Sequence, residues 1–259
     1  MTMPTIGLAP GTGFEVRTVA DVDRYLGAVA DAGFDAVSLS NTQLAGDPVA
    51  AARLLETHGL RCTDVLSMRV SRDEEETMAA VRSMRPAVEA LGAGHLLAMF
   101  WTRLNDESLD RLGRCAEEAG VPIALEFGPG GAADTVASAD GFVDALGLDH
   151  VSVLADTFHF SRGDSTWEML ESIPLEHLPI IQFTDALPAI SDDYMAETTN
   201  RRTWGGQGEL ELERFASTLL DRGWDGVVSV EVISAELRDL PVEEFAKAAY
   251  ATTAPYWKR

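Results

Sequence analysis

The chain has 259 residues, of which 46% are hydrophobic and 7% aromatic, so it can bury a sizeable core and matches the usual length of one eight-stranded α/β barrel. Its formal net charge of −22 and pI near 4.4 disfavour binding to nucleic acid or to an anionic membrane, and favour the attraction of cations. Two cysteines give neither a disulfide framework nor a zinc-binding spacing, and no apolar run reaches the roughly 18 residues of a membrane helix, so we expect a soluble cytoplasmic protein.

The first half of the chain repeats a couplet in which a short apolar strand is followed by an amphipathic helix. The helix expected at 19–32 has typical end signals, with Asp21 in its first turn and Gly33 directly after it. We expect strands at 5–9, 35–39, 62–68 and 95–100, and helices at 19–32, 48–58, from about 73 onward and 107–119. This alternation is typical of an α/β fold with a parallel sheet.

The second half continues the couplet but contains one long interruption. We expect strands at 123–125, 153–155, 179–181 and 227–230, and helices at 133–146, 210–222 and 241–255. The irregular segment 186–208 is longer than most loops of a compact domain, and such loops are usually functional or disordered. Eight strands about 30 residues apart, without a Gly-rich phosphate motif after the first, predict a single (β/α)8 TIM barrel over residues 1–259 rather than an open sheet.

Four successive strands of the second half end in an oxygen-bearing side chain. These residues are Glu126, Asp156, Gln182 and Glu231. Because the carboxyl ends of neighbouring barrel strands lie side by side, the four side chains should converge above the barrel axis. Three crowded carboxylates repel one another unless a cation holds them, and an all-oxygen ligand set suits Mg²⁺ or Mn²⁺. The alternative is that these acids pair with Arg162, Arg201 and Arg202; we favour the metal, because this face of a barrel seldom holds mere ion pairs.

The histidines divide into one candidate for catalysis and several structural residues. His159 follows Asp156 by three residues, and an imidazole can act as a base near neutral pH. His95, His150 and His177 each lie at the amino end of a strand, which in a barrel is the face that contributes to stability. Of these four histidines, only His159 is therefore expected to lie beside the strand-end residues.

Five segments together resemble the sugar phosphate isomerase/epimerase superfamily, whose xylose isomerase-like TIM barrels also include endonuclease IV relatives and several dehydratases. The segments are Ala124-Leu125-Glu126-Phe127, Asp156-Thr157-Phe158-His159, Gln182-Phe183-Thr184-Asp185, Asn200-Arg201-Arg202 with Gly206-Gln207-Gly208, and Gly226-Val227-Val228-Ser229-Val230-Glu231. The resemblance implies that Glu126, Asp156, Gln182 and Glu231 bind the metal. It also implies that His159 lies beside the metal and that Arg201 contacts the substrate.

Two features depart from the usual pattern of this superfamily. Its keto-sugar epimerases have histidine where this chain has Gln182, whereas glutamine there resembles the 3-dehydroshikimate dehydratases. Arg69, at the end of the third strand, is similar to an arginine that these dehydratases place near a substrate carboxylate. The loop that usually reads Pro-Gly-x-Gly reads Gly205-Gly206-Gln207-Gly208 here, so it lacks the proline of the usual pattern.

The sequence thus predicts a metal-dependent enzyme that removes a proton next to the carbonyl of a small polyhydroxylated keto substrate, with or without a carboxylate or phosphate. Dehydration ranks slightly ahead of isomerisation or epimerisation. A nuclease-like enzyme is disfavoured by the acidic charge, and a non-enzymatic sugar-binding barrel remains the third alternative. The expected proton-transfer residues are Glu126, Glu231 and His159; the expected substrate-binding residues are Arg69, Arg201, Arg202 and Trp101, with Arg103 and Arg162 on the same face. A homo-oligomer is compatible with the sequence.

Overall fold

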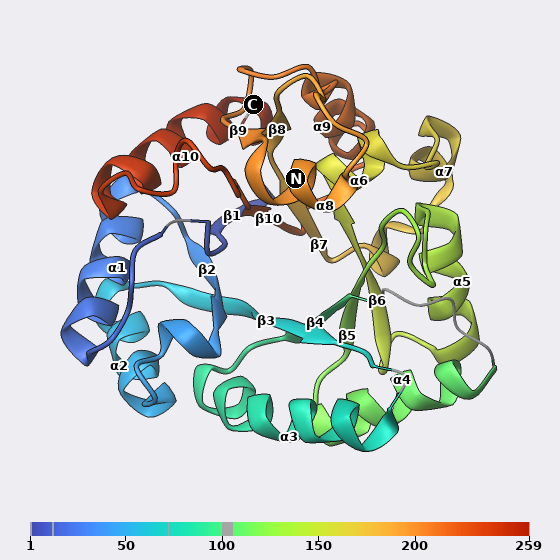
Figure 1. Ribbon diagram of the computed structural model, residues 1–259, viewed down its shortest axis with the longest axis horizontal. Helices are drawn as coiled ribbons and strands as arrows, with labels where there is room; N and C mark the ends of the chain where they lie inside the picture. The colour runs from blue at the N-terminus through green and yellow to red at the C-terminus, as the bar shows by residue number, and fades with distance from the viewer. Residues whose placement is uncertain (1, 12, 72, 100–105, 259) are drawn as a thin grey trace.

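Eight parallel strands close into a barrel in the computed structural model, which describes residues 2–11, 13–71, 73–99 and 106–258 (Figure 1). Around the barrel the strands follow one another in the order β1-β10-β7-β6-β5-β4-β3-β2. Their bounds are β1 (Thr5–Leu8), β2 (Ala36–Ser40), β3 (Arg61–Arg69), β4 (His95–Met99), β5 (Ile123–Glu126), β6 (Val151–Asp156), β7 (Ile180–Phe183) and β10 (Val227–Val230). The predicted TIM barrel is confirmed, and the strands lie within two residues of their expected bounds where the structure describes them.

Helices surround the barrel of strands (Figure 1). Their bounds are α1 (Val19–Ala32), α2 (Pro48–His58), α3 (Glu74–Leu91), α4 (Asp106–Ala119), α5 (Val136–Leu146), α6 (Thr157–Arg162), α7 (Trp167–Ser172), α8 (Tyr194–Asn200), α9 (Leu212–Leu220) and α10 (Val242–Trp257), with short 3₁₀ helices η1 (Asn41–Gln43) and η2 (Leu175–His177). Helix α1 shows why the end signals work: Thr18 and Asp21 form a capping box, and Gly33 ends the helix at a φ of 102°.

Strand alternation separates an outer core from an inner one. On β6, Val153 and Ala155 belong to the large core between strands and helices, whereas Leu154 points into the barrel. Inside, Leu154 packs with one side chain each from β3, β4, β5 and β7 and one from the end of β1: Leu66, Leu97, Ala124, Ile180 and Ala9. Asp156, two residues beyond Leu154, therefore points to the same inner side at the carboxyl end of the barrel.

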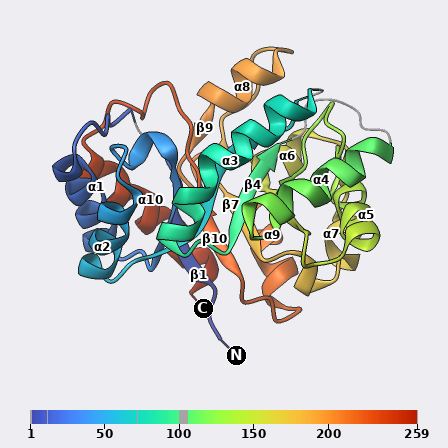
Figure 2. The same cartoon turned by 90° about the horizontal axis from the view of Figure 1, so that it is seen from below.

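The predicted irregular segment contains local structure that the sequence pattern did not reveal. A two-residue strand β8 (Asp185–Ala186) pairs antiparallel with β9 (Arg202–Thr203), and helix α8 lies between them. Helix α8 stands at one end of the barrel, opposite the end at which the N-terminus emerges (Figure 2). Within the described residues, no helix combines the length and hydrophobicity needed to cross a lipid bilayer.

Candidate active site at the strand ends

The four predicted strand-end residues lie together at the carboxyl end of the barrel, and we call them the rim cluster. The cluster consists of Glu126 of β5, Asp156 of β6, Gln182 of β7 and Glu231, which directly follows β10. Parallel register aligns Asp156 with Gln182, and Gln182 with Ser229, two residues before Glu231. All four side chains are buried, with exposed fractions between 0 and 9%. Gln182 Nε2 donates a hydrogen bond to Glu231 Oε1 at 3.1 Å.

Arg202 enters this cluster from β9 and forms ion pairs with two of its acids. Its Nη1 lies 2.6 Å from Asp156 Oδ2 and 3.2 Å from Glu231 Oε2. The rest of the guanidinium donates to the backbone oxygen of Thr198 at 3.0 Å and to its hydroxyl at 3.1 Å, and lies over the ring of Phe158. The predicted alternative of acid–arginine pairing therefore holds for Arg202, which lines the site but is committed to protein groups rather than free for a substrate.

The neighbouring Arg201 is not among the described residues that line the cavity at the rim cluster, and its expected contact with the substrate stays a prediction. Its Nη2 donates to the Pro188 carbonyl oxygen at 2.9 Å, and its Nε lies 3.8 Å from Glu197. Successive residues of an extended segment point to opposite sides, so the pairing of β8 with β9 turns Arg202 inward and Arg201 outward. Arg162 pairs with Glu209 at 2.7 Å, outside the rim cluster. Trp101 and Arg103 lie outside the described residues.

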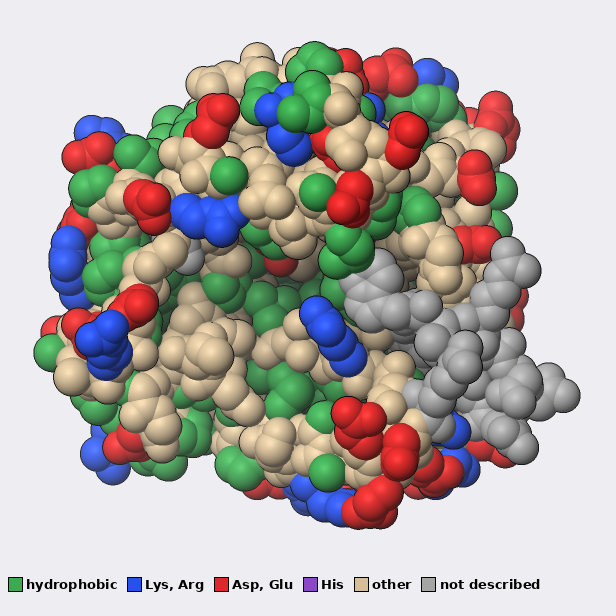
Figure 3. Space-filling model, viewed as in Figure 1, with side chains coloured by type: hydrophobic (Ala, Val, Ile, Leu, Met, Phe, Trp, Pro, Cys, Tyr) green, Lys and Arg blue, Asp and Glu red, His purple; other side chains and the backbone are tan. Residues whose placement is uncertain are grey.

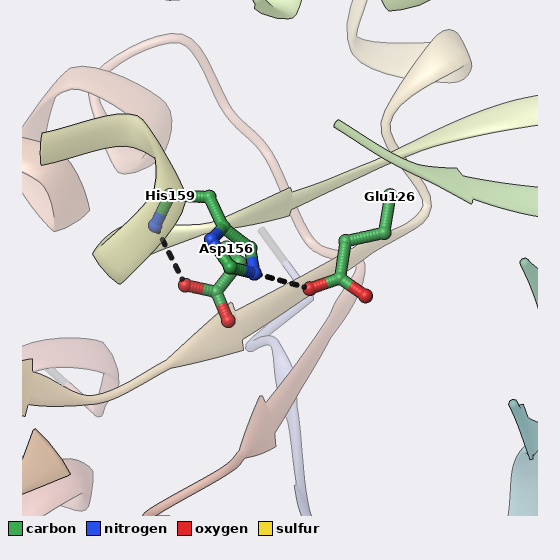
Figure 4. Close-up of side chains that lie close together, drawn as sticks. All are labelled: Glu126, Asp156 and His159. Atoms are coloured by element: carbon green, nitrogen blue, oxygen red, sulfur yellow. Dashed lines mark hydrogen bonds and ion pairs between the residues drawn. The ribbon is translucent and has the colours of Figure 1, made fainter. Parts of the chain in front are cut away.

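His159 lies beside the rim cluster, as predicted, and both of its ring nitrogens have partners. Its Nε2 is 3.0 Å from Glu126 Oε1, and its Nδ1 is hydrogen-bonded to the hydroxyl of Tyr194. Figure 4 shows the ring directed toward the Glu126 carboxylate. The position is set locally: Asp156 caps α6, and its Oδ1 accepts the backbone N–H groups of Phe158 at 2.6 Å and His159 at 3.1 Å. Tyr194 carried no signal in the sequence, because it lies in the segment without a periodic pattern.

The rim cluster carries more negative than positive formal charge, which favours the binding of a cation. Glu126, Asp156 and Glu231 carry three formal negative charges against one positive charge on Arg202, which leaves two. Burial, together with Glu126 and Asp156, raises the pKa of Glu231 to about 8, although Arg202 opposes this shift. Burial would also raise the pKa of Asp156, but Arg202 and His159 outweigh it and hold that pKa below its ordinary value.

Gln182 supplies the observation that fits a metal ion most directly. Its Oε1 is buried and has no hydrogen-bond partner among the described residues. An unpaired buried amide oxygen is costly unless something binds it. Ligand atoms of Glu126, Asp156 and His159 also lie within 4.8 Å of one another, which is close enough for a common ion. These three residues could hold a metal ion, and the fuller ligand set of Glu126, Asp156, Gln182 and Glu231 stays a prediction.

The rim cluster opens into a cavity of about 190 Å³, which suits a small ligand. Figure 3 shows a hollow in the middle of this face, with acidic and hydrophobic side chains visible inside it. One wall is apolar and is formed by Leu66, Leu97 and Met99. Arg69 also lines the cavity; its side chain is exposed, and it has no ion pair with any described residue. Arg69 thus lies where the sequence placed it and is free to meet an anionic group.

Asp185 holds the glycine loop, residues 205–208, in place. Its carboxylate is buried and accepts backbone N–H groups from Gly206 at 3.0 Å, Gly208 at 2.9 Å and Leu210 at 3.0 Å. A side chain on Gly208 would approach the Ala186 oxygen to 2.2 Å, so only glycine fits this crossing. The loop that leads away from Arg202 is therefore held by a carboxylate instead of by the usual proline.

A second buried polar group lies inside the barrel and was not predicted. Asp64 of β3 accepts hydrogen bonds from the hydroxyls of Ser38 and Thr63, both at 2.7 Å, and Ser38 is hydrogen-bonded to Ser229 at 2.9 Å. We call these four residues the Asp64 group. Burial raises the pKa of Asp64 to about 6, although the hydrogen bonds from Ser38 and Thr63 oppose this shift.

Comparison with known proteins agrees with the fold. The family described as xylose isomerase-like TIM barrel matches residues 26–254. An inosose isomerase of Bacillus velezensis is 30% identical over 222 residues, which cover 78% of this chain and 78% of that protein. A 3-dehydroshikimate dehydratase of Pseudomonas putida is 25% identical over 239 residues, which cover 85% of this chain but 37% of that longer protein. These relatives confirm the expectation of an enzyme of the isomerase or dehydratase kind.

Two solved structures show the same architecture. A crystal structure of the IOLI protein with a bound zinc atom superposes with a TM-score of 0.84 at 24% identity and covers 97% of both chains. An L-ribulose 3-epimerase superposes with a TM-score of 0.78 at 17% identity and covers 99% of this chain and 95% of that one. At these identities the similarity supports the barrel fold and not a particular reaction.

Proposed function

Because the chain belongs to the xylose isomerase-like TIM barrel family, we propose that it is a divalent-metal-dependent enzyme that removes a proton next to the carbonyl of a small polyhydroxylated ketone. The observation that carries this proposal is the buried rim cluster, in which three acids are balanced by only one arginine and Gln182 Oε1 has no described partner. Glu126, Asp156, Gln182 and Glu231 would hold the ion, with Mg²⁺ or Mn²⁺ favoured by their oxygen atoms.

The side chains around the cavity divide the remaining tasks. When bound, the divalent ion would stabilise the negative charge that develops on the substrate oxygen as the neighbouring C–H loses its proton. Glu231 lines the cavity and is our second candidate, with Glu126, for moving the substrate proton; a bound divalent ion would keep its carboxylate ionised. Glu126 faces His159, whose Nε2 keeps the acceptor oxygen of that carboxylate in place. Leu66, Leu97 and Met99 cover one face of the substrate and exclude water.

Isomerisation and dehydration begin with the same proton removal, and the relatives and the site residues favour different outcomes. The inosose isomerase relative matches most of both chains, which favours isomerisation of a cyclic keto polyol. Gln182 and the free Arg69 favour dehydration of a substrate that carries a carboxylate, as does the weaker dehydratase match. We place isomerisation first and dehydration second, because the inosose isomerase match has the higher identity and covers 78% of that protein, whereas the dehydratase match covers 37% of its own. The substrate of this chain is in either case a small keto polyol.

Deuterium exchange tests the common step without assuming the final product. The protein with Mn²⁺ or Mg²⁺ is incubated in D₂O with an inosose and, separately, with 3-dehydroshikimate, and proton NMR follows the signal next to the carbonyl. For at least one of the two substrates, we expect the signal to disappear faster with the metal-loaded wild-type protein than with chelator-treated protein or with the Glu231→Gln variant. Equal exchange in all three samples, for both substrates and for a panel of ketoses and their phosphates, would contradict the proposal.

The products of the same incubations separate the two outcomes. Dehydration of 3-dehydroshikimate gives an aromatic product that absorbs in the near ultraviolet, whereas isomerisation of an inosose gives a new non-absorbing cyclitol signal. Ultraviolet growth without a new inosose isomer would reverse the order given above. Parallel incubations with Zn²⁺ show whether the oxygen-rich site discriminates against that ion.

A further inference from the structure

We propose that Tyr194 is a positioning residue of this site: its hydroxyl donates to His159 Nδ1 and thereby fixes the tautomer in which Nε2 carries the hydrogen and faces Glu126. The proposal about the tautomer concerns the protein alone. Its consequence for turnover rests on the function proposed above. Neither the family match nor the relatives assign a role to this tyrosine.

The hydrogen-bond partners of His159 leave only one neutral arrangement without conflict. Glu126 is a carboxylate and can only accept, so the ring nitrogen 3.0 Å from its Oε1 must carry a hydrogen. A neutral imidazole has one N–H, so Nδ1 must then accept, and the group it meets is the Tyr194 hydroxyl. The opposite tautomer would set the Nε2 lone pair against a carboxylate oxygen. The Tyr194 hydroxyl therefore supplies the donor that Nδ1 needs when the hydrogen of the ring is on Nε2.

The hydroxyl of Tyr194 is held as a donor by its surroundings. Burial raises the pKa of Tyr194, and the negative charges of Asp156 and Glu126 raise it further, so its proton remains in place. The ring itself is packed, with its centroid 5.7 Å from that of His159 and 5.9 Å from that of Phe158. His159 is 1% exposed, and its ring meets Phe158 edge to face at 88°.

Helix α8 connects this tyrosine to the rest of the site. Asp193 caps the helix by accepting the backbone N–H of Ala196 at 3.0 Å, so Tyr194 is its first residue. One turn later Thr198 holds the guanidinium of Arg202 through its backbone oxygen and its hydroxyl. A seven-residue helix from the predicted irregular segment thus positions both groups that touch the acids of the rim cluster, the imidazole on Glu126 and the guanidinium on Asp156 and Glu231.

The tautomer determines which oxygen of Glu126 is available. Nε2–H binds Oε1, whereas no hydrogen bond from a described residue reaches Oε2. Figure 4 shows Oε2 directed away from the imidazole. The carboxylate is therefore oriented with one oxygen fixed and the other open to a ligand or to a substrate proton. Without the Tyr194 hydroxyl, the ring would lose its preference for one tautomer and Glu126 would lose that orientation.

Nitrogen-15 NMR of the histidine side chains tests the proposal directly in the full chain without substrate. The protein carries five histidines, so His159 is assigned by the signals absent from His159→Gln. In the wild type at a pH where the ring is neutral, we expect His159 to be at least tenfold enriched in the Nε2–H form. Tyr194→Phe keeps the packed ring and removes only the hydroxyl, and the enrichment should fall at least threefold. Tyr250→Phe is the matched control, because its hydroxyl binds Lys258 away from the site.

A wild-type His159 with Nδ1–H or a doubly protonated ring would overturn the proposal, as would a Tyr194→Phe spectrum identical to the wild type. Where a substrate has been identified, Tyr194→Phe should lower kcat roughly tenfold, the usual weight of one hydrogen bond, while KM changes less than about twofold. Unchanged kcat would overturn the positioning role. If no substrate is turned over, the proposed function fails, while the tautomer measurement still decides the role of Tyr194 in the structure.

Discussion

Two buried polar groups lie inside the same barrel, and they differ in how completely their charges and hydrogen-bonding atoms are paired. The Asp64 group has one carboxylate, whose Oδ1 accepts two hydroxyl hydrogen bonds. The rim cluster has three carboxylates, one guanidinium and an amide oxygen, Gln182 Oε1, without a described partner. Both are almost completely buried, so burial alone does not distinguish a binding site from a structural network. The two groups are distinguished by the uncompensated negative charge of the rim cluster and by the unpaired oxygen of Gln182.

The difference also predicts how each group responds to mutation. A satisfied network contributes to folding, so a change in it should alter stability more than function. A crowded and undercompensated cluster costs stability until a ligand arrives, so a change in it should alter function more than stability. The predictions that follow compare the two groups on these terms.

The largest effect is expected from Glu126→Gln and Glu231→Gln in the rim cluster. Each change removes one anionic oxygen donor, so the affinity for Mn²⁺ and the turnover should both fall by about 10³-fold. The free energy of unfolding of the metal-free protein should change by less than about 1 kcal/mol at neutral pH, because Glu126→Gln relieves repulsion and Glu231, with its pKa raised to about 8, is already largely protonated. Calorimetric titration with Mn²⁺ and urea unfolding in chelator measure the two quantities. A variant that keeps its metal affinity would remove the distinction between the two groups.

A smaller effect, on stability and its pH dependence, is expected from Asp64→Asn. The folded-state pKa of about 6 lies above the ordinary 3.8, so the folded protein binds this proton more tightly than the unfolded chain does. That contribution is fully present below about pH 4 and is lost as the pH rises through 6, by up to about 3 kcal/mol. Asn cannot titrate, so this part of the pH dependence should vanish in the variant. Urea unfolding at several pH values measures it, and parallel curves for both proteins would contradict the assignment; turnover should stay close to wild type.

The smallest effect is expected from Arg69→Gln at the cavity wall. Because Arg69 is the free cation of the described cavity lining, its loss should raise KM about tenfold for a carboxylated or phosphorylated substrate and leave a neutral keto polyol nearly unaffected. Arg201→Gln is the matched control, since Arg201 is bound to Pro188 outside the cavity. Equal KM changes for both variants would show that general surface charge, and not a subsite at Arg69, guides the substrate.

The sequence predicted the barrel and the rim cluster because both depend on local patterns. Strand periodicity places Glu126 and Asp156 at strand ends on the inner side, and the barrel then brings them together. It could not separate Arg201 from Arg202, because their directions depend on the pairing of β8 with β9, two residues long on each side. Tyr194 and Asp64 were missed for a related reason: each acquires its role from partners distant in sequence, His159 for one and Ser38 for the other.

The central claim, that the rim cluster holds a divalent cation, is tested most directly by anomalous scattering from a crystal soaked with Mn²⁺. We predict one strong manganese peak coordinated by Glu126, Asp156, Gln182 and Glu231, with Gln182 Oε1 among the ligands and the guanidinium of Arg202 moved away from at least one acid. A crystal without a peak at this position, with the Arg202 ion pairs intact, would contradict the claim. A peak coordinated by Glu126, Asp156 and His159 without Gln182 would contradict the proposed ligand set.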